Sequence, residues 1–146
     1  MTTALFALMF LVFGQTETSP LEGRWTADLS ASRLHPGVSV RSIALVFVVS
    51  PNRVRITDDV VLASGQQVGH GPAEFVTDGQ EHRNDALLAG LVVQARWVNP
   101  RRLETVLKRP NGVVERVSYE TSADGSTLTN TTDGPLGSQV IVFRRP

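Results

Sequence analysis

The side chains of this sequence that could do chemistry are few and widely spaced. The three histidines are His35, His70 and His82, and no two of them stand two residues apart. That spacing would let two histidines bind a metal from one face of a strand, so we expect independent loop or surface histidines and no metal site. The only adjacent acidic pair is Asp58–Asp59. On a strand these two side chains would point to opposite faces and could not act together as acid and base, so a role at a strand end or turn is expected.

Other catalytic chemistries lack their characteristic residues. The sequence has no cysteine, which excludes thiol catalysis, cysteine-bound metals and disulfides. It contains no G-x-S-x-G nucleophile elbow, no Walker loop and no G-x-G-x-x-G turn. We therefore expect no catalytic residues and no cofactor. An enzyme that uses a lone histidine or aspartate inside a cavity is the least favoured interpretation.

The bulk composition indicates one neutral domain. The chain has 146 residues, with 14 basic and 14 acidic side chains and a formal net charge of zero. This length suits a single domain, which can bury enough surface to fold without a metal or a disulfide. A protein without a basic surface is not expected to bind nucleic acid in general.

The N-terminal segment predicts export. Residues Ala4–Gly14 are almost wholly apolar and uncharged, a pattern typical of a signal-peptide hydrophobic region and too short to span a bilayer. We expect residues 1–14 to be a signal peptide cleaved before Gln15, residues 15–20 to be a flexible mature N-terminus, and residues 21–146 to be the domain. The product would be periplasmic or extracellular, with no membrane span after cleavage. The alternative is that the apolar segment is a buried strand or helix.

The rest of the chain predicts short antiparallel strands. Segments rich in Val, Ile, Thr and aromatic residues lie between turn signals made of Gly, Pro, Asn and Asp. Apolar and polar residues alternate with a period of two, which is typical of half-buried strands. This alternation is found in Arg24–Leu29, Arg53–Thr57, Leu91–Val98, Arg102–Lys108 and Arg116–Glu120.

Some segments depart from this alternation. Ser42–Val49 is apolar on both faces, so we expect a strand covered on both sides or one whose outer face meets a protein partner. Ser30–Gly37 is expected to be a loop or a single helical turn. Asp85–Gly90 is the other short helix-like stretch, and Asn111-Gly112 predicts a type I′ hairpin.

These elements predict an all-β fold. About eight to ten consecutive strands with tight connections form an antiparallel up-and-down meander. Full closure removes exposed strand edges, so a closed or nearly closed barrel is favoured over a flat sandwich.

The start of the first strand carries a family resemblance. Gly23-Arg24-Trp25 resembles the G-x-W signature of lipocalins, and the run from Gly23 to Gly37 resembles the opening of lipocalin-like, calycin-type domains of small exported bacterial proteins. The hairpins Phe75–His82 and Ser122–Thr129 resemble theirs as well, so the resemblance covers nearly the whole mature chain. It implies a lipocalin-like barrel and no particular activity.

The resemblance also implies a structural role for one late arginine. In true lipocalins such a residue packs on the G-x-W tryptophan and closes the barrel by cation–π stacking. The first candidate for stacking on Trp25 is Arg144, and the second is the adjacent Arg145.

The barrel interior leaves two functions open. An eight-stranded barrel holds either core side chains or one small ligand. In the first interpretation the protein binds a small hydrophobic molecule. In the second it is a structural or interaction domain of the cell envelope, with a packed core and a partner on the strand Ser42–Val49. The candidate cavity-lining residues are Val93, Trp97, Leu103, Leu107 and Tyr119.

Basic residues gather on neighbouring predicted strands. They form a solvated outer face or, alternatively, a patch for an anionic surface. They are Arg96, Arg101, Arg102, Lys108 and Arg109.

Overall fold

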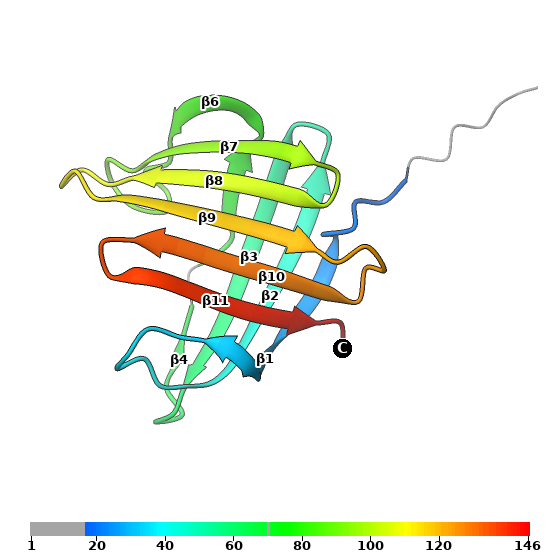
Figure 1. Ribbon diagram of the computed structural model, residues 1–146. Helices are drawn as coiled ribbons and strands as arrows, with labels where there is room; N and C mark the ends of the chain where they lie inside the picture. Colours follow the sequence, from blue (N-terminus) through cyan, green and yellow to red (C-terminus); the bar gives the residue numbers. More distant parts are fainter. Residues whose placement is uncertain (1–16, 70) are drawn as a thin grey trace, which may run out of the picture.

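The computed structural model describes residues 17–69 and 71–146, and the predicted signal peptide lies outside them. Within these ranges the chain forms eleven antiparallel strands in a single sheet (Figure 1). The strands are β1 Gly23–Arg33, β2 Val40–Ser50, β3 Arg53–Leu62, β4 Gln67–Val68, β5 Ala73–Val76, β6 Asp78–Arg83, β7 Val92–Asn99, β8 Arg102–Lys108, β9 Val114–Thr121, β10 Thr127–Gly134 and β11 Gly137–Arg144. In the part of the chain that the structure describes, no helix is long and apolar enough to cross a membrane.

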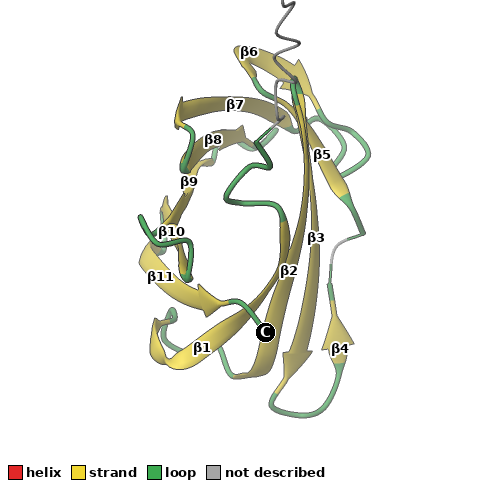
Figure 2. Ribbon diagram, turned by 90° about the vertical axis from the view of Figure 1, so that its right-hand side faces the viewer, coloured by secondary structure: helices red, strands yellow, loops and turns green. Residues whose placement is uncertain are grey.

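The strand order confirms the predicted antiparallel meander and adds one strand to the upper expected count. The order is β4-β3-β2-β1-β11-β10-β9-β8-β7-β6, so the first and last long strands pair with each other. The sheet curls strongly about its inner face (Figure 2). Among the described residues the hydrogen-bonded path does not close. The chain itself connects the two sides of the sheet that do not pair. Strand β5 pairs with β3, β6 pairs with β7, and only Thr77 separates β5 from β6.

The largest fully buried side chains lie at one end of the sheet, which we call the packed end. Apart from Leu21, which precedes β1, they come from the starts of β1, β3, β8 and β10 and from the ends of β2, β9 and β11, which antiparallel pairing places together. Leu128, for example, faces both Phe143 and Thr121 across its two neighbouring strands. These side chains are Leu21, Trp25, Phe47, Val54, Leu103, Thr121, Leu128 and Phe143.

Strand β1 runs farther than the sequence predicts. A loop or helical turn is expected over Ser30–Gly37, but β1 continues to Arg33 through an irregularity in its pairing with β11. The Asp28 carboxylate accepts hydrogen bonds from the Ser30 hydroxyl at 2.6 Å and the Ala31 amide at 3.3 Å. Short polar side chains can satisfy the local backbone in this way, so the strand bulges and then resumes.

The turn at Asn111-Gly112 is of a different type from the one predicted. A type I′ turn needs positive φ at both residues, but among the described residues only glycines have positive φ, and Gly112 is at 84°. The Gly112 amide donates to the Arg109 carbonyl at 3.0 Å, so the turn begins one residue earlier with Pro110 in second position. Proline presets φ there, and the type I′ prediction is wrong for that reason.

A cation–π contact joins the two ends of the domain at the packed end. The Arg145 guanidinium lies 4.0 Å from the centroid of the Trp25 ring. It also donates to the carbonyls of Glu22 at 2.9 Å and Pro20 at 2.8 Å. The Trp25 indole donates in turn to the Leu21 carbonyl at 2.9 Å. The last residues of the chain therefore hold the segment that precedes β1.

The structure places Arg144, the first candidate for this contact, elsewhere. Its Nε donates to Asp28 Oδ2 at 2.9 Å. Neighbouring residues at the end of a strand point to opposite faces, so only one of the two arginines can reach Trp25. The residue that does so is Arg145.

We expect Arg145→Ala to lower the free energy of unfolding by about 1–2 kcal/mol, because it removes the stacking on Trp25 and two charge-assisted hydrogen bonds. The matched variant Arg144→Ala breaks one largely exposed ion pair and should cost less than about 1 kcal/mol. Urea unfolding followed by tryptophan fluorescence measures both. An equal or larger loss in Arg144→Ala would contradict this role for Arg145.

Candidate functional site

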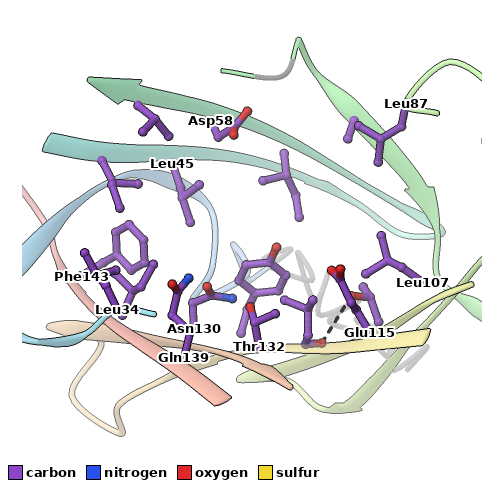
Figure 3. Close-up of a pocket in the computed structure, with 18 of the residues that line it drawn as sticks. Leu34, Leu45, Asp58, Leu87, Leu107, Glu115, Asn130, Thr132, Gln139 and Phe143 are labelled. Carbon is purple, nitrogen blue, oxygen red and sulfur yellow. Dashed lines mark hydrogen bonds between the residues drawn. The ribbon is translucent and has the colours of Figure 1, made fainter. Parts of the chain in front are cut away.

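A cavity of about 380 Å³ opens toward the end of the sheet opposite the packed end, and the packed-end residue Phe143 is part of its lining. Its walls come from β2, β3 and β5 on one side and from β8 to β11 on the other. A close view shows Asp58 and Leu45 from the first wall facing Asn130, Thr132 and Gln139 from the second (Figure 3). This volume lies within the range of about 300–1,000 Å³ that small-molecule sites occupy.

The wall formed by β2, β3 and β5 is apolar apart from one side chain. Alternating residues on each of these strands point inward, as the period of two requires. Asp58 is the exception, since it occupies the inward position of β3 between Ile56 and Val60. The apolar members of this wall are Val40, Ile43, Leu45, Ile56, Val60, Ala73 and Phe75.

The wall formed by β8 to β11 carries most of the polar groups. They occupy inward positions on four consecutive strands, beside apolar neighbours such as Leu107, Ile141 and Phe143. A molecule in the cavity would therefore meet hydrogen-bonding groups mainly along one side. The polar members of this wall are Thr105, Glu115, Tyr119, Asn130, Thr132 and Gln139.

Several of these polar groups are held in place by the backbone. Asn130 Nδ2 donates to the Ser118 carbonyl at 3.2 Å, and the Thr105 hydroxyl donates to the Val117 carbonyl at 3.3 Å. Gln139 Oε1 accepts from the His35 amide at 3.2 Å, which leaves the Gln139 amide nitrogen as the donor. Bonds of this kind fix the orientation of the side chains before anything binds.

Tyr119, the only tyrosine of the chain, lies in the polar wall with its ring against the packed end. Its ring meets Phe47 edge to face, with the two centroids 5.3 Å apart. Burial raises the pKa of the Tyr119 hydroxyl to about 12, and the negative charge of Asp58 adds to the shift. The hydroxyl therefore stays protonated at neutral pH and can donate or accept a hydrogen bond.

Loops cover the mouth of the cavity with apolar side chains. Leu34 and Val38 lie between β1 and β2, and Leu87 lies in the connection between β6 and β7. The amide of Leu87 donates to Asn84 Oδ1 at 3.2 Å, which helps to hold this helix-like stretch in a turn, and the Leu87 side chain lines the cavity. Leu136, in the turn between β10 and β11, is 85% exposed.

The five candidate cavity residues have different positions. Leu107 and Tyr119 line the cavity. Val93 and Leu103 are buried in the hydrophobic core, and Trp97 lies beside a separate surface hollow with Pro20 and Val49. All five residues are on strands, but the face of a strand does not say how far along the barrel a residue sits.

Apart from Tyr119, the sequence analysis did not identify the polar groups of the cavity, although their signal was present. Asp58 was expected at a strand end or turn, whereas it lies within β3 on the inner face. Asp59 points the other way, and its Oδ1 accepts from Gln67 Nε2 at 2.8 Å. A polar residue that breaks the inward apolar series of a strand is the pattern that finds such groups, and Asn130 after Leu128 shows it again.

His35, His82 and the basic cluster lie outside the cavity lining, and His70 is not among the residues that the structure describes. His82 Nε2 is 2.9 Å from Asp78 Oδ2, but both side chains are more than 40% exposed. Across the described residues no three His, Asp or Glu side chains gather as a metal site requires. Four of the five clustered basic residues pair with carboxylates: Arg96 with Glu104, Arg102 with Glu104 and Glu120, Lys108 with Glu81, and Arg109 with Glu115.

Comparison with known proteins identifies the fold. No protein-family model and no curated protein sequence matches the chain. Among solved structures, the wild-type fluorescent protein UnaG is 14% identical with a TM-score of 0.64, covering 86% of this chain and 96% of its own. A Schistosoma mansoni fatty-acid-binding protein in complex with arachidonic acid is 13% identical with a TM-score of 0.61, covering 88% and 97%. The REP1-NXSQ fatty acid transporter is 9% identical with a TM-score of 0.58, covering 88% and 98%.

These similarities show a fold of the lipocalin-like, calycin type. They confirm the lipocalin-like fold that the G-x-W resemblance implies. At such low sequence identity the comparison carries the fold alone, so the site must be judged from its own residues.

We expect the Tyr119 phenolate to form only near pH 12, which ultraviolet absorbance can follow without interference from another tyrosine. Because the folded state keeps a proton that the unfolded chain loses above pH 10.0, the free energy of unfolding should fall as pH rises from 10 to 12. The fall is at most about 1.4 kcal/mol per pH unit. Tyr119→Phe should lack this component. A phenolate appearing near pH 10 in the native protein would contradict a buried hydroxyl beside Asp58.

Proposed function

We propose that this protein binds a small, predominantly apolar molecule inside the curled sheet. The observation that carries the proposal is the cavity of about 380 Å³ at one end of the sheet. Apolar side chains on β2, β3 and β5 would cover one side of the molecule, and polar groups on β8 to β11 would orient it from the other. A concave apolar space with a few convergent polar groups is the usual form of a ligand site.

The structural neighbours support the same proposal. One is a fatty-acid-binding protein in complex with arachidonic acid, and another is a fatty acid transporter. Both share this fold over almost their full length. That a related fold carries hydrophobic molecules makes the interior the natural place to look for a ligand here.

The packed-core alternative is less well supported. Buried interiors are close-packed, with few voids larger than a water molecule, and a purely structural barrel gains nothing from an unfilled space of this size. Among the described histidines, the one acid–base pair, His82–Asp78, is exposed to solvent and lies outside the cavity. A protein partner on the outer face of β2 stays a prediction.

We also propose that the binding protein is exported, on the basis of the apolar segment Ala4–Gly14. N-terminal sequencing of the protein purified from its native host should give a chain that begins at Gln15. Recovery of an intact Met1 would overturn this part of the proposal and would leave the binding proposal untouched.

We expect the protein to bind Nile red, an uncharged dye that fluoresces strongly in apolar surroundings. Leu107→Trp places a larger side chain in the cavity and should weaken dye binding at least tenfold. Val106→Trp is the matched control, because the neighbouring residue on β8 points away from the cavity. Dye emission during titration measures both affinities, and thermal unfolding checks that both variants fold.

Two results would contradict the binding proposal. One is the absence of dye binding by the wild-type protein. The other is equal weakening in both variants, which would place the dye on the outer surface of β8.

A further inference from the structure

Exposed apolar side chains gather around the mouth of the cavity. Among the described residues six large apolar side chains are exposed, and four of them stand in or beside the connections at the end of the sheet opposite the packed end. Each of the four belongs to a different connection: β1–β2, β6–β7, β8–β9 or β10–β11. We call them the rim residues, and they are Val38, Leu88, Val114 and Leu136.

The strand topology explains why these four connections meet. In an antiparallel meander every second connection lies at the same end of the sheet, and the pairing of β1 with β11 brings the first and the last of them together. In Figure 1 the β8–β9 turn, the β10–β11 turn and the β1–β2 loop all lie on the left of the molecule. The rim residues are thus separate tips around one opening, which fits a broad surface better than a narrow groove.

The rim continues the apolar surface of the cavity outward. Val38 lines the cavity and is also 47% exposed. Leu136 is 85% exposed and is not part of the hydrophobic core. Single exposed apolar residues are normal on protein surfaces, but a group of them around an opening indicates an interaction site.

Two arginines beside the rim form no ion pair with a described residue. Arg33 ends β1 and Arg41 is the second residue of β2, so they flank the loop that carries Val38. The Arg41 side chain lies against the β3–β4 turn, where Nη2 donates to the Ala63 carbonyl at 3.4 Å. Both charges therefore stand at the same end of the sheet as the rim residues.

The acidic side chains of the same connections have cationic neighbours. Asp85 pairs with Arg83 at 3.1 Å, and Glu115 pairs with Arg109 at 3.3 Å. Asp133 stands directly opposite Arg116 in the pairing of β10 with β9. These acids are balanced locally, so they do not cancel the charge of the two arginines that flank the β1–β2 loop.

An apolar rim flanked by cations matches the chemistry of a bilayer that contains anionic lipids. Proteins bind to the surface of such membranes by burying apolar side chains at the headgroup level, and nearby Lys or Arg side chains add attraction to the negative surface. A stable protein partner would instead need a continuous patch of about 800 Å². Four separate tips around an opening do not form such a patch.

We propose that the rim docks on a bilayer that carries anionic lipids, with the mouth of the cavity facing the membrane. Leu88, Val114 and Leu136 enter the headgroup region, and Arg33 and Arg41 lie at its surface. This inference goes beyond the proposed binding function, because docking requires only the outer surface. For the apolar ligand proposed above, docking gives a short route between the bilayer and the interior.

Cosedimentation with phosphatidylcholine vesicles, with and without phosphatidylglycerol, measures docking in the absence of a ligand. We expect the wild-type protein to bind the anionic vesicles more tightly. Leu136→Glu and Val114→Glu should each weaken this binding by about tenfold or more, because a carboxylate replaces a side chain that enters the membrane. Val98→Glu is the matched control: Val98 is 47% exposed against 42% for Val114, but it lies on β7 at the packed end.

The arginines are tested separately from the apolar tips. Arg33→Gln and Arg41→Gln should each weaken binding to the anionic vesicles by about fivefold and leave binding to the uncharged vesicles unchanged. Arg101→Gln removes the same charge at the β7–β8 turn of the packed end and should leave both affinities unchanged. All variants share the same N-terminus, so a contribution from the apolar segment Ala4–Gly14 is common to them.

The outcomes separate this inference from the binding function. Docking is overturned if the wild-type protein binds neither kind of vesicle, or if the rim and packed-end variants bind alike. It is also overturned if the protein sediments as a dimer that Leu136→Glu separates, because the rim is then an interface between two copies. Thermal unfolding checks the fold of each variant, and should Leu136→Glu not fold, Val114→Glu decides. Failure to bind Nile red overturns the binding function alone.

Discussion

The pairing of β1 with β11 is the constraint on which the rest of this structure depends. It joins the first long strand to the last, so that a meander of short hairpins has to curl instead of lying flat. The same pairing brings Arg145 over Trp25 and places the Gln139 side chain against the His35 amide at the other end. Both the packed end and the mouth of the cavity thus depend on contacts between residues more than a hundred positions apart.

The distribution of large side chains along the curled sheet then divides the interior in two. Trp25, Phe47 and Phe143 fill the packed end, and buried aromatic side chains of this size dominate the energetics of a core. Toward the other end the inward positions hold smaller and more polar residues, of which Asn130 and Thr132 are examples. A space remains there because no large side chain reaches across it. Stability and binding are therefore carried by opposite ends of the same strands.

The alternation in the sequence was enough to predict the faces of the strands, because the period of two is a local property. It could not predict depth along the barrel. Leu103 and Leu107 share the inner face of β8, yet one lies in the core and the other in the cavity. Depth depends on the register between strands, which long-range pairing sets. The bulge after Asp28 and the turn at Pro110 are likewise decided by local hydrogen bonds and proline geometry that composition alone does not reveal.

The charged side chains on the outer faces of the strands and Asp58 on the inner face lie in different surroundings. On the outer faces of β7, β8 and β9 the arginines alternate with glutamates as paired neighbours, and such exposed pairs add little free energy each. A carboxylate on an apolar inner wall is a different matter, because partial burial costs free energy that a packed apolar residue would avoid. A valine or isoleucine would continue the series of Ile56 and Val60 at no such cost. An acid at that position therefore needs a partner, in the protein or in the cavity, that offsets this cost.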